Sequence, residues 1–380
     1  MKVKKRVIKK KSQVKRTKTQ TTAKDNNTTK NLKKSKPQNK LQELSVGRQL
    51  NLADILRLNK AVYAGSTDSD SMFVGNNGVW KAYQSVISYF PFKCPEFDCS
   101  VNIKNLKTVF AIFDKIEVEF AEKQVIISKN DITVKFPYME TDKSDLDIFR
   151  GMQDNAENLE IEWQKVPGNL AEAVSVATRT VSENPIHGTL TCFSFSELGI
   201  VTSNNISLTA AKLDSPFATC LLDKRALLGV LGITPTHFKA TKNFMLFINA
   251  DGVIVQLPIV LGSFPEFSHI LGIKGIDFVE FDKEKLKQIA SLSEGLFDGN
   301  NLYDNSLTIK IENNVLEIKN HSSMGTVKGK MAVVSEKDFS FSIDSQTLMM
   351  LTEVSAKIGL NDNKVVVDSE GLKLISSLGE

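Results

Sequence analysis

The sequence predicts an α+β protein built from three repeated domains, each with antiparallel sheets and two helices. A chain of 380 residues is longer than one ordinary hydrophobic core, so two or three domains are expected. Helix-like and strand-like segments also recur in the same order. The first helices begin near residues 52, 168 and 283, which are 116 and 115 residues apart, and the second helices near 105, 224 and 345, which are 119 and 121 apart. This period is typical of whole domains, which we place at residues 46–157, 158–275 and 276–380.

Residues 1–45 are predicted to be a disordered basic tail. The first 40 residues contain sixteen Lys and Arg, a single acidic residue and almost no large apolar side chain, so they cannot bury enough surface to offset the entropy of ordering. A cationic arm of this kind attracts polyanions such as nucleic acid without sequence preference. A nuclear-import signal and a role in solubility are the alternatives. Residues 41–380 carry 32 basic and 43 acidic residues, a net charge of −11.

The first domain begins with apolar residues spaced as one helix face over residues 50–63. Strand-like runs follow near 71–75, 78–90 and 98–103, and a second helix is predicted at 105–113. Three alternating strands are predicted at 115–123, 124–130 and 131–139. Residues 141–157 are acidic, rich in amides and without periodicity, which predicts a linker.

The second and third domains repeat this order. The second domain has predicted helices at 167–181 and 224–231, and predicted strands at 158–165, 189–195, 199–203, 206–213, 217–223, 236–242, 244–249 and 253–261. Asp251-Gly252 between two apolar runs predicts a hairpin. The third domain has predicted helices at 283–296 and 345–356, and predicted strands at 276–282, 306–313, 315–320, 326–334, 339–344, 357–362, 364–369 and 372–378.

Catalytic and metal-binding motifs are missing from the sequence. The four cysteines have no CxxC spacing and are expected to be partly buried free thiols, and the four histidines lie singly. We find neither a GxxxxGK[ST] phosphate loop nor a GxGxxG after a strand. We therefore expect no enzymatic activity, no cofactor and no metal. No apolar run approaches the roughly 20 residues of a membrane helix, and the basic N-terminus lacks the apolar segment of a signal peptide, so we expect a soluble intracellular protein.

Two helices among antiparallel strands must cover one face of a sheet in each unit. If three units lie side by side, all helices can share one face of a continuous curved sheet. An arc of this kind leaves exposed edge strands at both ends, which favour pairing with another copy. A head-to-tail contact then closes into a ring if the rotation permits it.

Residues 217–267 resemble the second domain of the bacterial DNA polymerase III β sliding clamp. The segment runs from a strand and a helix through Thr234-Pro235 to strands that end in Gly262-Ser263-Phe264-Pro265-Glu266-Phe267. The family closes this domain with a Gly-x-Phe-Pro-Asp-Tyr-like sequence, so Glu266 and Phe267 stand where Asp and Tyr are usual. A weaker similarity occurs in Phe136-Pro137-Tyr138. In topology the resemblance covers residues 46–380, and its departures fit a divergent version of the family, such as one from a virus or phage.

The resemblance implies a mechanical function as a DNA polymerase processivity factor. Two three-domain subunits form a homodimeric ring around duplex DNA without reading its sequence, and twelve helices line the hole. The polymerase and the clamp loader bind through short peptides. The implied location is the cytoplasm at the nucleoid, or the host cytoplasm for a viral protein.

The lining of the hole requires basic helices inside an acidic body. The candidates on or beside the six predicted helices are Arg57, Lys60, Lys104, Lys107, Arg179, Lys224, Arg225, Lys285 and Lys287.

The resemblance also implies an apolar pocket for partner peptides between the second and third domains. Carried over by position, it involves Thr202, Leu208, Pro235, Phe238, Ile375 and Leu378. The family's Thr-Asp-Gly-His-Arg-Leu stretch reads Thr202-Ser203-Asn204-Asn205-Ile206-Ser207-Leu208 here, without its Gly-His-Arg. We therefore expect a different peptide specificity.

A different class of function fits the same composition. A basic disordered arm on a β-rich body is also how a viral coat protein holds its genome, although coat domains favour jelly rolls with few helices. A trimeric ring and a role in transcription are further alternatives that the sequence leaves open.

Overall fold

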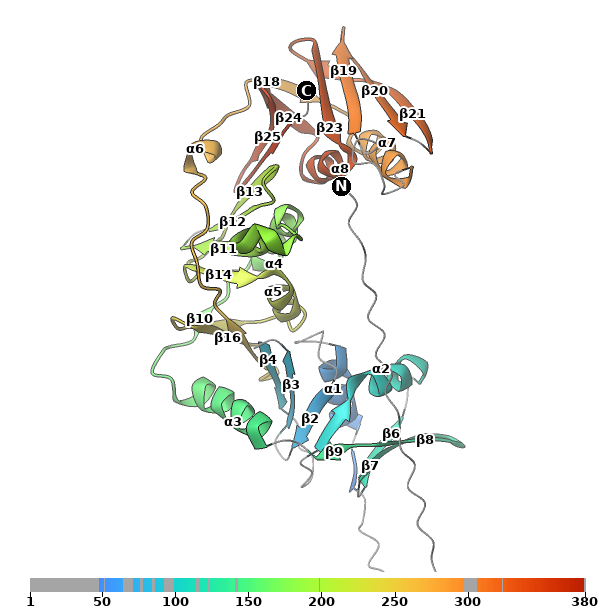
Figure 1. Ribbon diagram of the computed structural model, residues 1–380, viewed down its shortest axis with the longest axis vertical. Coiled ribbons are helices and arrows are strands. Elements are labelled where there is room, and N and C mark those ends of the chain that lie inside the picture. The colour runs from blue at the N-terminus through green and yellow to red at the C-terminus, as the bar shows by residue number, and fades with distance from the viewer. Residues whose placement is uncertain are drawn as a thin grey trace, which may run out of the picture. The chain divides into compact units, whose positions relative to one another are not determined.

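The computed structural model describes most of the chain after residue 47 (Figure 1). The described residues are 48–50, 52–63, 71–75, 78–83, 86–91, 99–113, 116–121, 123–140, 143–197, 199–296, 306–322 and 324–378. All of them belong to one compact unit, Ser45–Glu380. The predicted basic tail, residues 1–45, lies outside the described residues.

Six helices recur in pairs along the chain, at the places that the spacing predicts. They are α1 (Leu52–Tyr63) and α2 (Ile103–Ile112), α4 (Leu170–Ala177) and α5 (Lys224–Leu231), and α7 (Lys283–Gly295) and α8 (Ser345–Val354). Within the compact unit, Figure 1 shows these six helices on one side of the sheets, with α3 and α6 (Ser268–Leu271) on the other. The fold is therefore the predicted α+β repeat.

Four antiparallel sheets form the body, and two of them cross from one repeat to the next. In spatial order, the first nine-stranded sheet contains β10 (Gln164–Lys165), β15 (His237–Ala240), β16 (Phe244–Ile248), β17 (Ile254–Pro258), β4 (Val86–Pro91), β3 (Gly78–Tyr83), β2 (Ser71–Gly75), β5 (Cys99–Asn102) and β9 (Met139–Glu140). The second contains β14 (Cys220–Asp223), β11 (Cys192–Ser196), β12 (Gly199–Ser203), β13 (Ser207–Lys212), β26 (Leu372–Ser377), β25 (Lys364–Ser369), β24 (Lys357–Asn361), β18 (Asp277–Glu280) and β22 (Val334–Ser335).

Two four-stranded sheets complete the body. One contains β1 (Arg48–Gln49), β6 (Glu117–Ala121), β7 (Gln124–Lys129) and β8 (Ile132–Pro137), and the other β21 (Gly325–Ala332), β20 (Val315–Ser322), β19 (Ser306–Glu312) and β23 (Phe339–Asp344). The expectation of one continuous sheet is therefore wrong. Among the described strands, one pairing crosses each boundary between repeats, β17 with β4 and β13 with β26. All the other strand pairings join strands of the same repeat.

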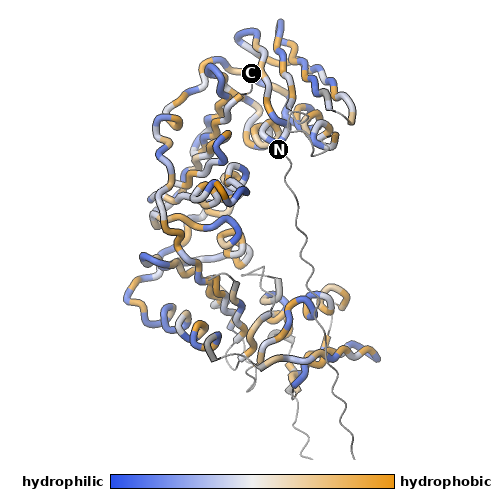
Figure 2. Tube along the Cα trace, in the orientation of Figure 1, coloured by the Kyte–Doolittle hydropathy of each residue, from blue (hydrophilic) through white to orange (hydrophobic). Residues whose placement is uncertain are grey.

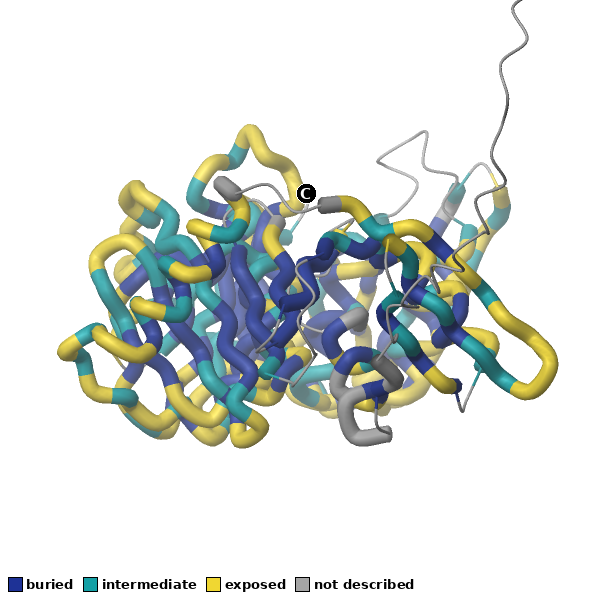
Figure 3. The backbone as a smooth tube through the Cα atoms, turned by 90° about the horizontal axis from the view of Figure 1, so that it is seen from below, coloured by how far each residue is buried: buried dark blue, intermediate teal, exposed yellow. Residues whose placement is uncertain are grey.

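Strand burial follows the period of two that places alternate side chains on opposite faces. In β19, Leu307, Ile309 and Ile311 are buried while the residues between them are exposed. Figure 2 shows this alternation of apolar and polar residues along the strands, and Figure 3 shows buried strand segments with exposed turns. One core cluster underlies the first four repeated helices, and another the third pair.

Residues 141–157 do not form the predicted linker. Lys143–Asn158 is a 16-residue helix, α3, with Phe149, Met152 and Ala156 buried on one face. These side chains pack on the face of the first nine-stranded sheet that lies opposite the repeated helices (Figure 1). The apolar residues are spaced by three and four, but they are few, so the acidic composition obscures the helix.

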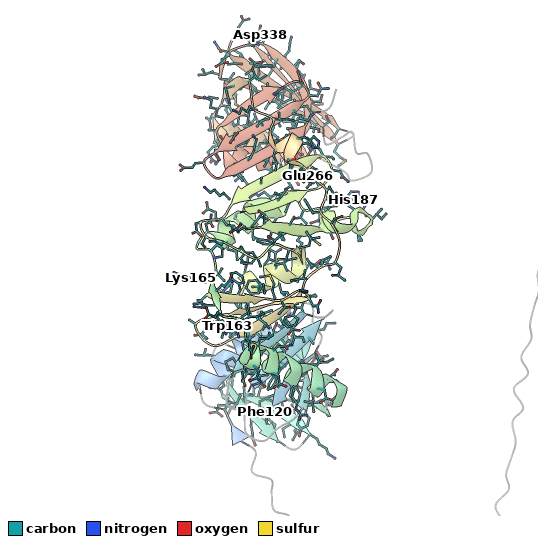
Figure 4. All side chains as sticks on the ribbon, turned by 90° about the vertical axis from the view of Figure 1, so that its left-hand side faces the viewer. Phe120, Trp163, Lys165, His187, Glu266 and Asp338 are labelled. Carbon is teal, nitrogen blue, oxygen red and sulfur yellow. The ribbon has the colours of Figure 1, made fainter. Side chains whose placement is uncertain are left out.

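Lys239 forms hydrogen bonds with the carbonyl end of α3. Its Nζ donates hydrogen bonds to the carbonyl oxygens of Ala156, at 3.1 Å, and Leu159, at 3.3 Å. The same Nζ lies 4.9 Å from the ring centroid of Trp163, which Figure 4 labels near this helix. A cation at the carbonyl end of a helix satisfies otherwise unpaired acceptors and offsets the helix dipole.

The hairpin predicted around Asp251-Gly252 is present as β16 and β17. Gly252 has φ +77°, a conformation that glycine adopts without strain. The Asn249 side-chain oxygen accepts from the backbone N–H groups of Asp251 and Val253, both at 2.9 Å. The hairpin therefore closes through a side-chain cap as well as through its glycine.

The remaining expectations concern two strand limits, the cysteines and membrane helices. The strand predicted at 158–165 is reduced to β10, and residues 189–191 belong to a 3₁₀ segment, η2 (Pro185–Thr191), before β11 begins. Cys192 and Cys220 are buried free thiols, as expected, Cys99 is also buried, and Cys94 lies outside the described residues. Among the described residues, no helix is both long and apolar enough to span a membrane.

Candidate nucleic-acid interface

The repeated helices carry an excess of positive charge although the body is acidic. Together with the short 3₁₀ segment η1 (Thr178–Thr180), they contain ten Lys and Arg and five Asp and Glu. Residues 41–380 as a whole carry a net charge of −11. The repeated helices are therefore net basic, and we call the side of the sheets on which they lie the basic side.

The predicted DNA contacts all lie on these helices or on η1, and they differ in exposure. Lys104, Arg225 and Lys285 are exposed, on α2, α5 and α7 respectively. Lys107 is half-buried on α2. The side chain of Arg57 lies outside the part of α1 that the structure describes.

Lys60 and Lys224 are each paired with an acid of another element. Lys60 on α1 lies 2.6 Å from a carboxylate oxygen of Asp251, in the β16–β17 turn, and so joins the first repeat to the second. Lys224 on α5 lies 3.0 Å from Glu183, and its hydrogen bond and charge lower the pKa of the Glu183 carboxyl. Such pairs neutralise part of the basic side.

Arg179 and Lys287 share one carboxylate. Arg179 of η1 forms an ion pair with one oxygen of Glu353 on α8, and Lys287 Nζ of α7 lies 3.5 Å from the other oxygen. Arg179 belongs to the second repeat and the other two residues to the third. Both predicted cations therefore have an acidic partner at the junction of these repeats.

Sequence reasoning missed two features of this side. Lys283, on α7, donates to the backbone oxygen of Glu353 at 2.8 Å. The second helix of each repeat also begins at the same kind of cap, because the side chains of Asn102, Asp223 and Asp344 accept hydrogen bonds from the backbone of the first turn. These caps are 121 residues apart in both intervals, a more regular signal than the helix starts.

The residues predicted for a peptide pocket are distributed over two sheets. Leu208 and Ile375 face each other across the β13–β26 pairing and are buried. Thr202, on neighbouring β12, is buried, and its hydroxyl donates to the carbonyl of Ala177 at 2.9 Å.

Phe238 is fully buried in β15, in the other nine-stranded sheet, with its ring centroid 4.5 Å from that of Phe217. Pro235 and Leu378 are half-buried. The structure thus brings Leu208 and Ile375 together and places Phe238 in a separate sheet, and the peptide pocket itself stays a prediction.

The described part of the chain contains no group of three or more His, Cys, Asp or Glu side chains that could hold a metal ion. No family model and no curated protein matches the chain. The comparison of structures, by contrast, finds the same architecture in bacterial replication proteins.

A structure described as a DNA polymerase III β subunit of Eubacterium rectale superposes with a TM-score of 0.69 at 11% identity, covering 87% of this chain and 99% of that one. The chain has the sliding-clamp fold. The DNA polymerase sliding clamp of Pseudomonas aeruginosa gives a TM-score of 0.67 at 10% identity, covering 88% and 99%. The β subunit of the Streptococcus pyogenes polymerase gives 0.65 at 13% identity, covering 87% and 99%. The sliding-clamp fold therefore extends over nearly all of each of these chains.

Proposed function

We propose that the protein is a sliding clamp, a ring that encircles duplex DNA and tethers a polymerase as a processivity factor. The observation that carries the proposal is the basic side of an acidic body, formed by a pair of helices that recurs in each of three repeats of a sliding-clamp fold. A clamp needs contacts to phosphate that carry no sequence information. Lys and Arg on helices supply such contacts, and their mutual spacing need not match any base sequence.

The ring requires at least two subunits, and we propose a head-to-tail homodimer of three domains each, with boundaries near residues 157 and 275. Two edge strands support this arrangement. β8 ends one four-stranded sheet and β21 ends the other. Both strands pair on one side only among the described residues, and Ile132 of β8 is 53% exposed. Unpaired edges of this kind favour addition of a strand from another copy. A solution mass of twice 42.1 kDa is expected, and a stable trimer would instead indicate a three-subunit ring.

The partners that we propose are a polymerase and a clamp loader, each binding through a short peptide near the β13–β26 junction. The protein would act in the cytoplasm at the nucleoid, or in the host cytoplasm if it is viral. The basic tail would add non-specific affinity for DNA, in proportion to the phosphates it neutralises. The fold gives no support to the alternative of a viral coat protein.

Retention on circular DNA tests the proposed function. The full-length protein is incubated with closed circular DNA and with the same DNA linearised, and both are washed in high salt. A ring stays on the circle, because its retention is topological, and slides off free ends. Cutting the circle after the wash should release the protein. Equal loss from both forms would contradict a clamp and indicate electrostatic binding alone.

A further inference from the structure

One position near the start of the second helices separates the third repeat from the other two. Counted from the caps Asn102, Asp223 and Asp344, the second helical residue is Lys104 in α2, Arg225 in α5 and Gln346 in α8. Two repeats therefore present a cation there and the third an amide. The sequence of α8, SQTLMMLTEV, contains a single charged residue, the acid Glu353.

The cations at the third repeat come instead from other elements. A pocket of about 350 Å³ is lined by Gln346 and also by Arg179, which η1 of the second repeat supplies. Lys287 approaches from α7. The positive charge beside α8 is thus present, but both cations contact Glu353.

We propose that Glu353 is an internal competitor of DNA phosphate: its carboxylate occupies Arg179 and Lys287 and releases them only when a phosphate group replaces it. This inference rests on the proposed function, because it concerns the same basic side of the helices. It makes Arg179 and Lys287 weaker DNA contacts than the exposed Arg225 and Lys285. A weak contact suits a protein that must move along DNA.

The two cations are accessible to a phosphate. The side chains of Arg179 and Lys287 are 37% and 43% exposed, and that of Glu353 is 30% exposed, although its oxygen nearest Arg179 is buried. The 350 Å³ pocket beside Arg179 is large enough for a phosphate group. Its polar lining includes Asn204, Thr347 and the acid Asp344, whose carboxylate accepts a hydrogen bond from the backbone N–H of Thr347. An entering anion therefore has space next to the ion pair.

Replacing the Glu353 carboxylate by a phosphate, as the acceptor for Arg179 and Lys287, should change the free energy little. A partly exposed ion pair is weak, because water screens the charges and holding two long side chains costs entropy. A phosphate accepts the same forked hydrogen bonds from Arg as a carboxylate does. Glu353 therefore lowers the net affinity for phosphate without removing the cations from the interface.

The salt dependence of DNA binding measures the number of phosphates neutralised, with a log–log slope of about 0.9 per contact. We compare the full-length protein with E353Q on one duplex by fluorescence anisotropy across a salt series. The basic tail is identical in both, so its contribution cancels in the difference. We expect E353Q to steepen the slope by about 0.9 to 1.8, which corresponds to one or two additional contacts.

The matched control is E284Q, which removes the same charge from an exposed site on α7. Glu284 forms no ion pair with any described residue, so its removal frees no cation, and we expect a smaller change in slope. Adding R179Q to E353Q should then remove about 0.9 of the slope gained. An E353Q slope equal to that of E284Q would overturn the inference and indicate that Glu353 only stabilises the junction between the second and third repeats.

A second measurement holds even if E353Q does not fold. In the otherwise unchanged protein, R179Q leaves Glu353 paired with Lys287, so the slope should change by less than half of the roughly 0.9 lost in R225Q. Equal losses in R179Q and R225Q would overturn the inference. If neither R225Q nor any other helix variant affects binding, the proposed function fails instead, which separates the two outcomes.

Discussion

Leu208 of β13 lies directly opposite Ile375 of β26, and both side chains are buried where the second nine-stranded sheet crosses between repeats. This pair is part of the only strand pairing that joins the second and third repeats among the described residues. Its side chains therefore contribute to the stability of the junction as well as to any peptide site beside it.

Leu208→Ala should destabilise the protein by about 2–5 kcal/mol, because it removes buried methyl groups and leaves a cavity. Urea unfolding followed by circular dichroism measures the loss. Ile206→Ala is the control, since Ile206 is exposed in the adjacent turn and should change the free energy of unfolding by about 0.5 kcal/mol or less. Equal effects of the two substitutions would contradict a packed junction at Leu208.

Charge reversal at Arg225 and Lys285 should weaken DNA binding. Both side chains are exposed on repeated helices, and replacing them by Glu removes two phosphate contacts and adds repulsion. The log–log slope of affinity against salt should fall by about 1.8 or more. The control reverses Lys242 and Lys274, which are exposed outside the helices and give the same change of net charge. Equal slopes in the two double variants would exclude the helices as the DNA-contacting side.

Phe149→Ala should detach α3 from its sheet. The Phe149 ring lies 5.7 Å from that of Phe73 and 6.0 Å from that of Trp80, measured between centroids, and Phe149 is buried. Loss of a buried phenylalanine costs about 3–5 kcal/mol. Unfolding followed by tryptophan fluorescence reports the effect. Ile148→Ala, on the exposed side of the same helix, should leave stability nearly unchanged, and a large loss there would contradict the assigned orientation of α3.

Lys81 should make stability rise with pH. Burial, and secondarily the charge of Lys107, lowers the pKa of the Lys81 ammonium from 10.5 to about 7. Its Nζ donates to the carbonyl oxygen of Ala61 on α1 at 3.0 Å. Between pH 7 and 10.5 the unfolded chain binds more protons than the folded one, so the free energy of unfolding increases with pH, by up to about 1.4 kcal/mol per pH unit.

Below pH 7 both states are protonated, and the full cost of burying the charge remains. Lys81→Met should remove the rise, which urea unfolding at pH 7, 8 and 9 can detect as a difference between the two proteins. Parallel pH profiles would show that Lys81 stays charged in the folded state.

Much of the fold was predictable from local patterns. Helix faces and strand alternation repeat every few residues, so the spacing of segments showed three similar units without any knowledge of contacts. The hairpin at Gly252 followed from its turn residues. The nine basic residues were also predictable as a class, since they belong to helices whose limits the apolar spacing sets.

The helix α3 was not predictable in this way. Its buried face consists of a few apolar residues among acids, and it is stable because Phe73, Trp80 and Tyr89 present an apolar surface on which it packs. Helices in folded proteins obtain most of their stability from such tertiary contacts. The sheet that supplies this surface comes from two repeats.

Local patterns in the chain are enough to predict the three repeats, their helix pairs, the hairpin and the excess of basic residues on the helices, because these depend on neighbours a few positions away. Only the three-dimensional packing shows which strands join the repeats, where α3 packs, and that Glu353 lies between Arg179 and Lys287. Those features depend on residues far apart in the chain, and only the pairing of strands and the packing of helices brings their side chains within reach.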